Sequence, residues 1–426
     1  MARKSGKLET VQDVLKETDI TIDSIERNEA FIRELVKNAR AVPDYRHPSY
    51  VRHLLEDILV ISLLAVLADC DEWEEIADFA RQKEKWLRRY LELPNGIPSS
   101  DTFRVVVSGI NPVHFYQVIM GVLENIIDDI YCTVSGEKAE RDILSMDGKE
   151  SRGSRRSRGG NALHTLNLYS ADYGICIGQE FIEEKSNEIP AGPKLLERMD
   201  IKDCVVTWDA LNTQKDTVEA VIKGGGEYVA ALKGNHPLFW QELREFFGEE
   251  ELERLKREPG SYLKTTEKEH GGIAVREYYQ TEDVEWYAEK DKWKNLKSFG
   301  TVRKRLLTDE GEKEETRYYI SSLPAGIELF EKAVRQHWGV ENKLHWHLDF
   351  TFRDDRNRTA EKTGAKNMQI LKKTALGILK LVQGMYGQSL KRIRKTIARD
   401  CENELEKILS SISADAVKAA IEAGNH

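Results

Sequence analysis

Three carboxylates stand in local contexts that could bring them to one metal site. Asp147 lies in ILSMDGKES, Asp209 in CVVTWDALNTQKD and Glu341 in VRQHWGVENKLHWHLDFTF. The two aspartates follow short apolar runs typical of β-strands, whereas Glu341 lies in a stretch with helical periodicity. Three oxygen donors from separate elements suit Mg²⁺ or Mn²⁺. Since two such ions can activate an attacking oxygen and stabilise the leaving oxygen of a phosphodiester, the pattern predicts a two-metal nucleic-acid enzyme.

Each carboxylate also has a structural interpretation that remains open at this stage. The Asp-Gly pair at position 147 is an ordinary turn signal. Asp209 could cap the helix that follows it. On a helix, His337, Glu341 and His345 share one face, which permits a zinc site. The His-Glu-x-x-His arrangement and any cysteine support are missing, so zinc is the weaker alternative.

Composition narrows the class of protein. The chain has 426 residues, so two or three domains are expected, and its 32% charged and 40% hydrophobic residues are typical of a globular protein. Five scattered cysteines without a Cys-x-x-Cys pair favour a reducing cytoplasm over a disulfide framework. The start shows no signal-peptide pattern, and the longest apolar run, residues 58–68, is too short to span a bilayer. We therefore expect a cytoplasmic protein without a membrane role.

The net charge of −9 by itself counts against a nucleic-acid partner, because affinity for phosphate comes largely from Lys and Arg. Two basic clusters, KESRGSRRSR at 149–158 and KRIRKTIAR at 391–399, show that the charge is unevenly distributed. The first cluster follows Asp147 directly, where phosphates would have to pass. A solvated surface is the alternative interpretation of either cluster.

The order of predicted elements divides the chain into five segments. Residues 1–45 are expected to be a polar, loosely attached arm, and residues 46–138 an all-helical domain suited to binding DNA ends. Residues 139–258 show three strand-like runs joined by turns, followed by alternating helices and strands. Residues 259–323 form a β-rich insertion, and 324–426 hold a long helix with Glu341 and the C-terminal helices. The predicted fold is α/β, with an RNase H-like catalytic core, the β-rich insertion and an all-helical N-terminal domain.

Six ordered segments resemble the DDE transposases of bacterial insertion sequences, specifically the group that includes the H-repeat-associated proteins. The segments are WEEIADFARQKEKWLRRYLELPNGIPSSDTF (73–103), SMDGKESRGS (145–154), TWDALNTQKD (207–216), YVAALKGNHP (228–237), YYISSLPA (318–325) and RQHWGVENKLHWHLDFTFRDDRNR (335–358). The resemblance covers about residues 45–410. It implies an RNase H-like core and Mg²⁺ dependence, with Mn²⁺ as a substitute, and makes Asp147, Asp209 and Glu341 the catalytic, metal-binding triad.

The resemblance also implies partners. The expected partner is double-stranded DNA, both the element's terminal inverted repeats and the target, with self-association in a synaptic complex. The residues expected to contact DNA are Lys149, Arg152, Arg155, Arg156, Arg158, Lys233, Arg335, His337 and Lys343.

The chain departs from the family pattern around the glutamate. Related transposase groups carry Tyr, Arg and Lys at positions that here hold Val334, His337 and Leu348. Arg335 and Lys343 lie nearby but out of register, so His337 is the candidate substitute for the arginine. Two alternatives follow: a decayed or regulatory DNA-binding copy, and an RNase H-like nuclease that acts on another DNA substrate.

Overall fold

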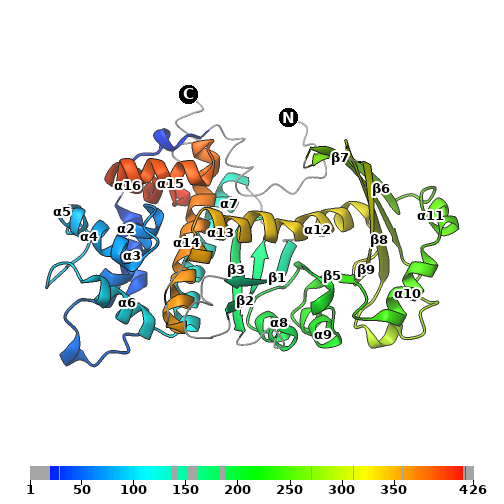
Figure 1. Ribbon diagram of the computed structural model, residues 1–426, viewed down its shortest axis with the longest axis horizontal. Helices are drawn as coiled ribbons and strands as arrows, with labels where there is room; N and C mark the ends of the chain where they lie inside the picture. Colours follow the sequence, from blue (N-terminus) through cyan, green and yellow to red (C-terminus); the bar gives the residue numbers. More distant parts are fainter. Residues whose placement is uncertain are drawn as a thin grey trace.

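The structure is a computed structural model that describes residues 20–27, 29–135, 143–151, 162–182, 188–269, 271–309, 311–356, 359, 361–415 and 418. A helical body occupies one end of the molecule, and a mixed sheet with its covering helices occupies the middle and the other end (Figure 1). The predicted Arg152, Arg155, Arg156 and Arg158 lie outside the described residues. None of the described helices is long and apolar enough to cross a membrane.

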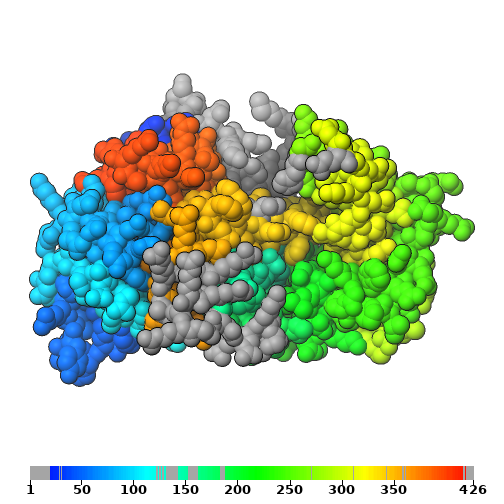
Figure 2. Space-filling model, in the orientation of Figure 1, coloured from blue at the N-terminus to red at the C-terminus, as the bar shows by residue number. Residues whose placement is uncertain are grey.

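The helical body is built from both ends of the chain. Its N-terminal helices are α2 (Ala30–Ala39), α3 (Leu55–Leu67), α4 (Trp73–Gln82), α5 (Glu84–Leu87), α6 (Ser100–Gly109) and α7 (Pro112–Ser135). Its C-terminal helices are α14 (Lys362–Tyr386), α15 (Leu390–Arg399) and α16 (Cys401–Ser411). Helix α14 packs on α3, α6 and α7, and α16 packs on α2. In the space-filling view the C-terminal helices lie directly against the N-terminal ones (Figure 2).

The predicted division at residue 45 needs correction, because residues 20–42 are not a loosely attached arm. Ile22, Ile32, Leu35 and Val42 are buried in the main core. Ile32 and Leu35 lie on one apolar face of α2, and this helix packs on α3. Helix α6 begins after an N-cap residue, Ser99, whose Oγ accepts a hydrogen bond from Thr102 N at 3.2 Å.

The strands form one nine-stranded sheet in the order β3-β2-β1-β4-β5-β9-β8-β7-β6. Their bounds are β1 Ile143–Ser151, β2 Leu163–Ser170, β3 Ile175–Ile182, β4 Val205–Trp208, β5 Glu227–Leu232, β6 Tyr262–Glu269, β7 Gly272–Thr281, β8 Ser298–Thr308 and β9 Gly311–Ser321. The three predicted strand-like runs are β1, β2 and β3, which form an antiparallel meander, and β4 and β5 continue the sheet in parallel with β1.

The predicted β-rich insertion is continuous with this sheet. Strand β9 pairs antiparallel with β5, from Tyr318 opposite Leu232 to Ser321 opposite Val229, and β8, β7 and β6 follow outward. Helices α10 (Pro237–Phe246) and α11 (Glu249–Leu255) lie at this end of the molecule (Figure 1). The insertion therefore widens the sheet that carries the two aspartates.

Two sets of helices cover opposite faces of the central strands. Ser145 Oγ on β1 donates to Gln336 O of α12 (Ile327–Gly339), so the odd-numbered residues of β1 face α12. A Cβ on Gly148 would lie 2.9 Å from Oε1 of Glu188 on α8 (Glu188–Leu196), so the even-numbered residues face α8. Helix α9 (Lys215–Lys223) packs beside α8. The side chain of Asp147 consequently emerges on the α12 face.

Candidate active site

Asp147 and Asp209 come from neighbouring parallel strands. Met146 of β1 is paired with Trp208 of β4, so the aspartates that follow these residues lie side by side on the α12 face. Asp147 lies within β1, which continues to Ser151, rather than at a strand end before a turn as predicted. The Asp-Gly pair is therefore part of a strand. Its glycine is required because Glu188 lies where a larger side chain at position 148 would project.

Asp209 follows β4 directly and also caps a short 3-10 turn at Ala210–Asn212. Its Oδ1 accepts hydrogen bonds from Asn212 N at 3.4 Å and from Asn212 Nδ2 at 3.5 Å. Burial raises the pKa of Asp209 above its ordinary value, and the charge of Glu188 adds to this rise. Asp209 therefore caps this short turn and not the following helix α9, whose N-cap residue is Gln214. The contacts with Asn212 fix one oxygen of a carboxylate that is half-buried beside Asp147.

Glu341 lies where the helical geometry changes. The predicted long helix that carries Glu341 runs without a break from α12 through a π-helical turn, Val340–His345, into α13 (Trp346–Phe350). π-helical turns are rare in proteins, and those that do occur are frequently found at functional sites. The π-helical turn has more residues per turn than an α-helix. His337 contacts β4 and His345 contacts β1, so the two imidazoles do not converge on Glu341. Glu341 is exposed and lines a cleft of about 840 Å³.

Asp147 interacts electrostatically with the other carboxylates of the site. Burial raises the pKa of Asp147 to about 7, and the negative charges of Asp209, Glu188 and Glu341 add to the rise. The Gly148 backbone amide lowers this pKa but does not cancel the increase. An ionised Asp147 is therefore unfavourable in its own environment unless a cation neutralises the site.

Glu188 is a buried carboxylate that the sequence did not single out. Its Oε1 accepts a hydrogen bond from Asn212 Nδ2, and its Oε2 lies 3.0 Å from His164 Nε2. It stands on the α8 face, beneath Gly148 and opposite the side chain of Asp147. No local motif marks this residue, because only the packing of α8 on the sheet brings it near the two aspartates.

His345 connects Asp147 to a buried polar chain. Its Nδ1 lies 3.5 Å from Asp147 Oδ2, and its Nε2 lies 3.3 Å from Asn167 Nδ2. The Asn167 amide is oriented by Lys373, whose Nζ donates to Asn167 Oδ1 at 2.5 Å. Asn167 therefore presents its NH₂ group to Nε2, which must accept, so the imidazole proton lies on Nδ1 toward Asp147. Burial, Lys149 and Lys373 lower the pKa of His345 to about 3, so the ring is neutral.

His337 occupies a separate, smaller pocket beside Asp209. Its Nδ1 lies 3.2 Å from Thr207 Oγ1, and Lys233 and Arg317 line the same pocket. Burial, with Arg317 and Lys233, lowers the pKa of His337 to about 4. The ring is uncharged at neutral pH and supplies no positive charge to a phosphate.

The remaining predicted DNA contacts are distributed around the site. Lys149 is buried in an ion pair with Asp349, and Arg335 pairs with Glu267 at 2.6 Å. Lys233 and Lys343 are exposed. Lys149 and Arg335 thus already have acidic partners, whereas the two exposed lysines present their charges to solvent.

No three His, Cys, Asp or Glu side chains within the described ranges stand close enough together to hold a metal ion. The donor chemistry nevertheless fits a divalent cation, since Asp147, Asp209 and Glu341 supply only oxygen. The raised pKa of Asp147 points in the same direction, because a cation would offset the repulsion among these carboxylates.

Known protein families and relatives match this chain over most of its length. The family described as "Transposase DDE domain" matches residues 138–378, and "DDE_Tnp_1-associated" matches residues 38–121. The "H repeat-associated putative transposase YhhI" of Escherichia coli K12 is 34% identical over 89% of this chain and 98% of its own length. The "Putative transposase YncI" of Escherichia coli O157:H7 is 32% identical over 90% and 96%.

A solved piggyBac transposase synaptic complex with hairpin DNA aligns with 95% of this chain and 82% of its own. The alignment has 12% identity and a TM-score of 0.34, a likeness too low to carry an argument.

Proposed function

The chain belongs to the transposase DDE domain family, and from this premise we propose that it binds the terminal inverted repeats of its own insertion sequence and catalyses metal-dependent cleavage and transfer of DNA strands. The observation that carries the proposal is the placement of Asp147 and Asp209 on adjacent parallel strands, with Glu341 electrostatically coupled to Asp147. The strand order β3-β2-β1-β4-β5 supports an RNase H-like core.

Asp147, Asp209 and Glu341 would hold Mg²⁺ or Mn²⁺. When bound, these ions would supply activation of the attacking oxygen and stabilisation of the leaving oxygen. The protein's own part is positioning: Asn212 fixes one oxygen of Asp209, and the Nδ1–H of His345 faces one oxygen of Asp147. Fixed ligands of this kind lower the cost of orienting the reactants.

DNA contacts complete the proposal. The exposed Lys233 and Lys343 are free to meet phosphates, and Lys149 with its ion-pair partner Asp349 stands beside the cleft that contains Glu341. The helices of residues 46–138 are assigned to DNA-end binding, and holding two ends requires at least a dimer on DNA.

One observation favours the alternative of a decayed or regulatory DNA-binding copy. His337 stands where related groups carry an arginine, and it is uncharged. Arg317 and Lys233 line the same pocket, so the lost charge has nearby substitutes. Because both interpretations predict DNA binding, only an assay of chemistry separates them.

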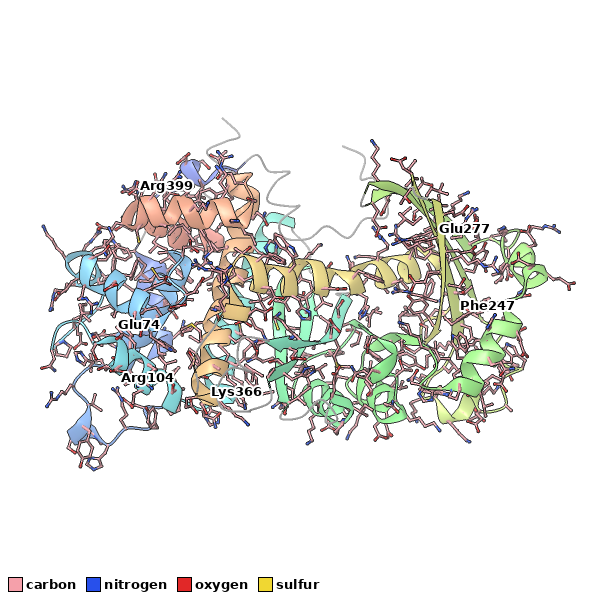
Figure 3. The ribbon with its side chains drawn as sticks, viewed as in Figure 1. Glu74, Arg104, Phe247, Glu277, Lys366 and Arg399 are labelled. Atoms are coloured by element: carbon pink, nitrogen blue, oxygen red, sulfur yellow. The ribbon has the colours of Figure 1, made fainter. Side chains whose placement is uncertain are left out.

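The test is cleavage and joining of a labelled duplex that carries the DNA flanking this gene, with Mg²⁺ or Mn²⁺. Asp147→Ala, Asp209→Ala and Glu341→Ala are compared with Glu74→Ala, an exposed carboxylate on α4 in the helical body (Figure 3). We expect activity in the native chain and in Glu74→Ala, and loss in the other three. Binding without cleavage by the native chain would favour the regulatory alternative. Cleavage without joining would favour a nuclease, and activity retained in Asp147→Ala would refute the assigned triad.

A further inference from the structure

The segment from Lys362 to Arg399 contains ten Lys and Arg residues but no Asp or Glu. This absence is unusual in a chain with 73 acidic residues and a net charge of −9. Four of the ten cations are buried with polar partners: Lys372 with Asp354, Lys373 with Asn167, Lys380 with Tyr169, and Arg394 with Asp71. The exposed cations of this segment concentrate on α15.

Helix α15 presents a line of cations without acidic partners. Lys391, Lys395 and Arg399 are exposed and spaced by four residues, so they lie on one face at intervals of about 6 Å. Within the described residues, none of the three forms an ion pair. On α11, by contrast, Arg254 pairs with Glu251 and Glu258. An uncompensated row of this kind is suited to a polyanion.

The row starts at the candidate active site. Lys391 and Lys395 line the same cleft of about 840 Å³ as Glu341, Gly148 and Lys149. Arg399 lies at the end of α15, further along the outer surface of the helical body (Figure 3). The cations therefore lead from the coupled carboxylates out along the helical body.

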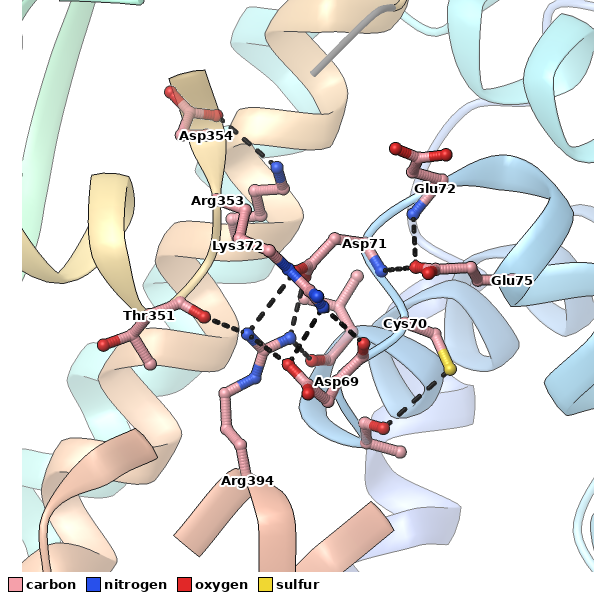
Figure 4. A network of polar contacts seen from close by, with 12 residues as sticks. Asp69, Cys70, Asp71, Glu72, Glu75, Thr351, Arg353, Asp354, Lys372 and Arg394 are labelled. Carbon is pink, nitrogen blue, oxygen red and sulfur yellow. Dashed lines mark hydrogen bonds and ion pairs between the residues drawn. The ribbon is translucent and has the colours of Figure 1, made fainter. Parts of the chain in front are cut away.

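A buried network holds α15 in this position. Arg394 donates through Nη2 to Val66 O at 2.6 Å and pairs with Asp71 Oδ1 at 2.7 Å and Asp69 Oδ1 at 3.0 Å (Figure 4). Arg353, which follows α13, joins the same two aspartates. Through the buried Arg394, α15 is thus tied both to the N-terminal helices and to the segment after Glu341, which fixes the direction of the exposed row.

We propose that Lys391, Lys395 and Arg399 form a binding track for the DNA backbone, along which a DNA segment leaves the active-site cleft. The inference rests on the proposed function, because the cleft is taken to hold the reacting phosphodiester. It extends DNA contact to the C-terminal helix α15, which carries none of the residues that the family resemblance implies as DNA contacts. A row of lysine and arginine contacts phosphates without reading bases, so the track contributes affinity rather than sequence specificity.

The test compares two triple variants with the same change in charge. Lys391→Gln/Lys395→Gln/Arg399→Gln removes the track, whereas Lys256→Gln/Lys290→Gln/Lys292→Gln removes three lysines that pair with glutamates outside the helical body. Binding of a labelled duplex carrying the flanking DNA is measured by fluorescence anisotropy across salt concentrations, in EDTA. Circular dichroism checks that each variant is folded, and cleavage of the same duplex is measured separately with Mg²⁺.

We expect the track variant to lose at least about tenfold in affinity and to lower the slope of log K against log salt by about 3, one for each phosphate contact. The control variant should bind within about twofold of the native chain. Equal DNA affinities and equal salt slopes for the track and control variants would refute the proposed binding track. If the native chain then still cleaves the duplex, the proposed function stands without it, whereas native protein that neither binds nor cleaves DNA overturns both.

Discussion

Replacing Asp147 with asparagine is expected to make the metal-free protein more stable while abolishing its chemistry. The side chain keeps its size and polarity but can no longer ionise. In the folded chain, burial and the neighbouring carboxylates raise the pKa of Asp147 from 3.8 to about 7. The folded state therefore binds more protons than the unfolded state between these two values. Stability falls as the pH rises through this window, and the full penalty is present above about pH 7.

The size of this penalty follows from the pKa. The interval between 3.8 and about 7, at 1.36 kcal/mol for each pKa unit, gives a ceiling of about 4 kcal/mol. The Asp147 side chain keeps 28% of its surface exposed, so solvent screening reduces the effect, and we expect about 1–3 kcal/mol. Between about pH 6 and pH 8 the advantage of Asp147→Asn should grow by about 1 kcal/mol, because most of the remaining ionisation occurs there.

The assay is urea unfolding in EDTA, followed by tryptophan fluorescence at about pH 6 and pH 8, with Mg²⁺ added in a parallel series. Mg²⁺ should stabilise the native chain more than Asp147→Asn, because the substitution removes a ligand. Asp44→Asn is the control, and it should lower the stability at both pH values, since the hydrogen bond from Arg46 lowers the pKa of Asp44 and favours its ionised form. Native protein as stable as Asp147→Asn at pH 8, or a difference independent of pH, would refute this electrostatic reasoning.

Three further outcomes are expected. Gly148→Ala should lower the free energy of unfolding by about 1–3 kcal/mol, because its Cβ would lie 2.9 Å from a buried glutamate oxygen. Gly234→Ala, whose Cβ would have nothing within 4 Å, should change it by less than about 0.5 kcal/mol. Equal urea midpoints for the two variants would contradict this expectation. Nitrogen-15 NMR should find His345 neutral with its proton on Nδ1 from about pH 5 to 8, since its pKa is lowered to about 3, and a titration within that range would exclude this assignment. Arg394→Met should cost about 2–4 kcal/mol, because the buried Asp71 would keep only Arg353 among its described cationic partners and the carbonyl of Val66 would lose its donor, against about 0.5 kcal/mol for the exposed Arg392→Met. Similar losses would mean that the network of Figure 4 is not stabilising.

Local pattern was sufficient for most elements. Three short strand-like runs joined by turns predicted β1, β2 and β3, which pair as an antiparallel meander. The run CVVTWD located β4 and, with it, the carboxylate of Asp209. These features depend on contacts between residues close in sequence, for which side-chain period and turn residues carry the information.

The fold of the molecule's two ends depended on distant contacts. The sequence placed residues 259–323 between the second aspartate and the glutamate, but only the pairing of β9 with β5 joins them to the central sheet. Residues 20–42 were expected to be loosely attached because they are mostly polar, yet one apolar face of α2 packs on α3. Hydrophobic period shows which face of an element is buried, but it does not identify what covers that face.

The sequence by itself determined the three carboxylates of the candidate triad and the elements that carry them, because residue type and local period are written along the chain. Tertiary structure alone decided that Glu341 lies in a π-helical turn, that Glu188 approaches beneath Gly148, and that α15 borders the cleft. The physical reason is that the burial of a side chain, the electrostatic field at it and its neighbours in space all depend on residues far apart in sequence. The pKa of Asp147, for example, rises through groups up to almost two hundred residues away.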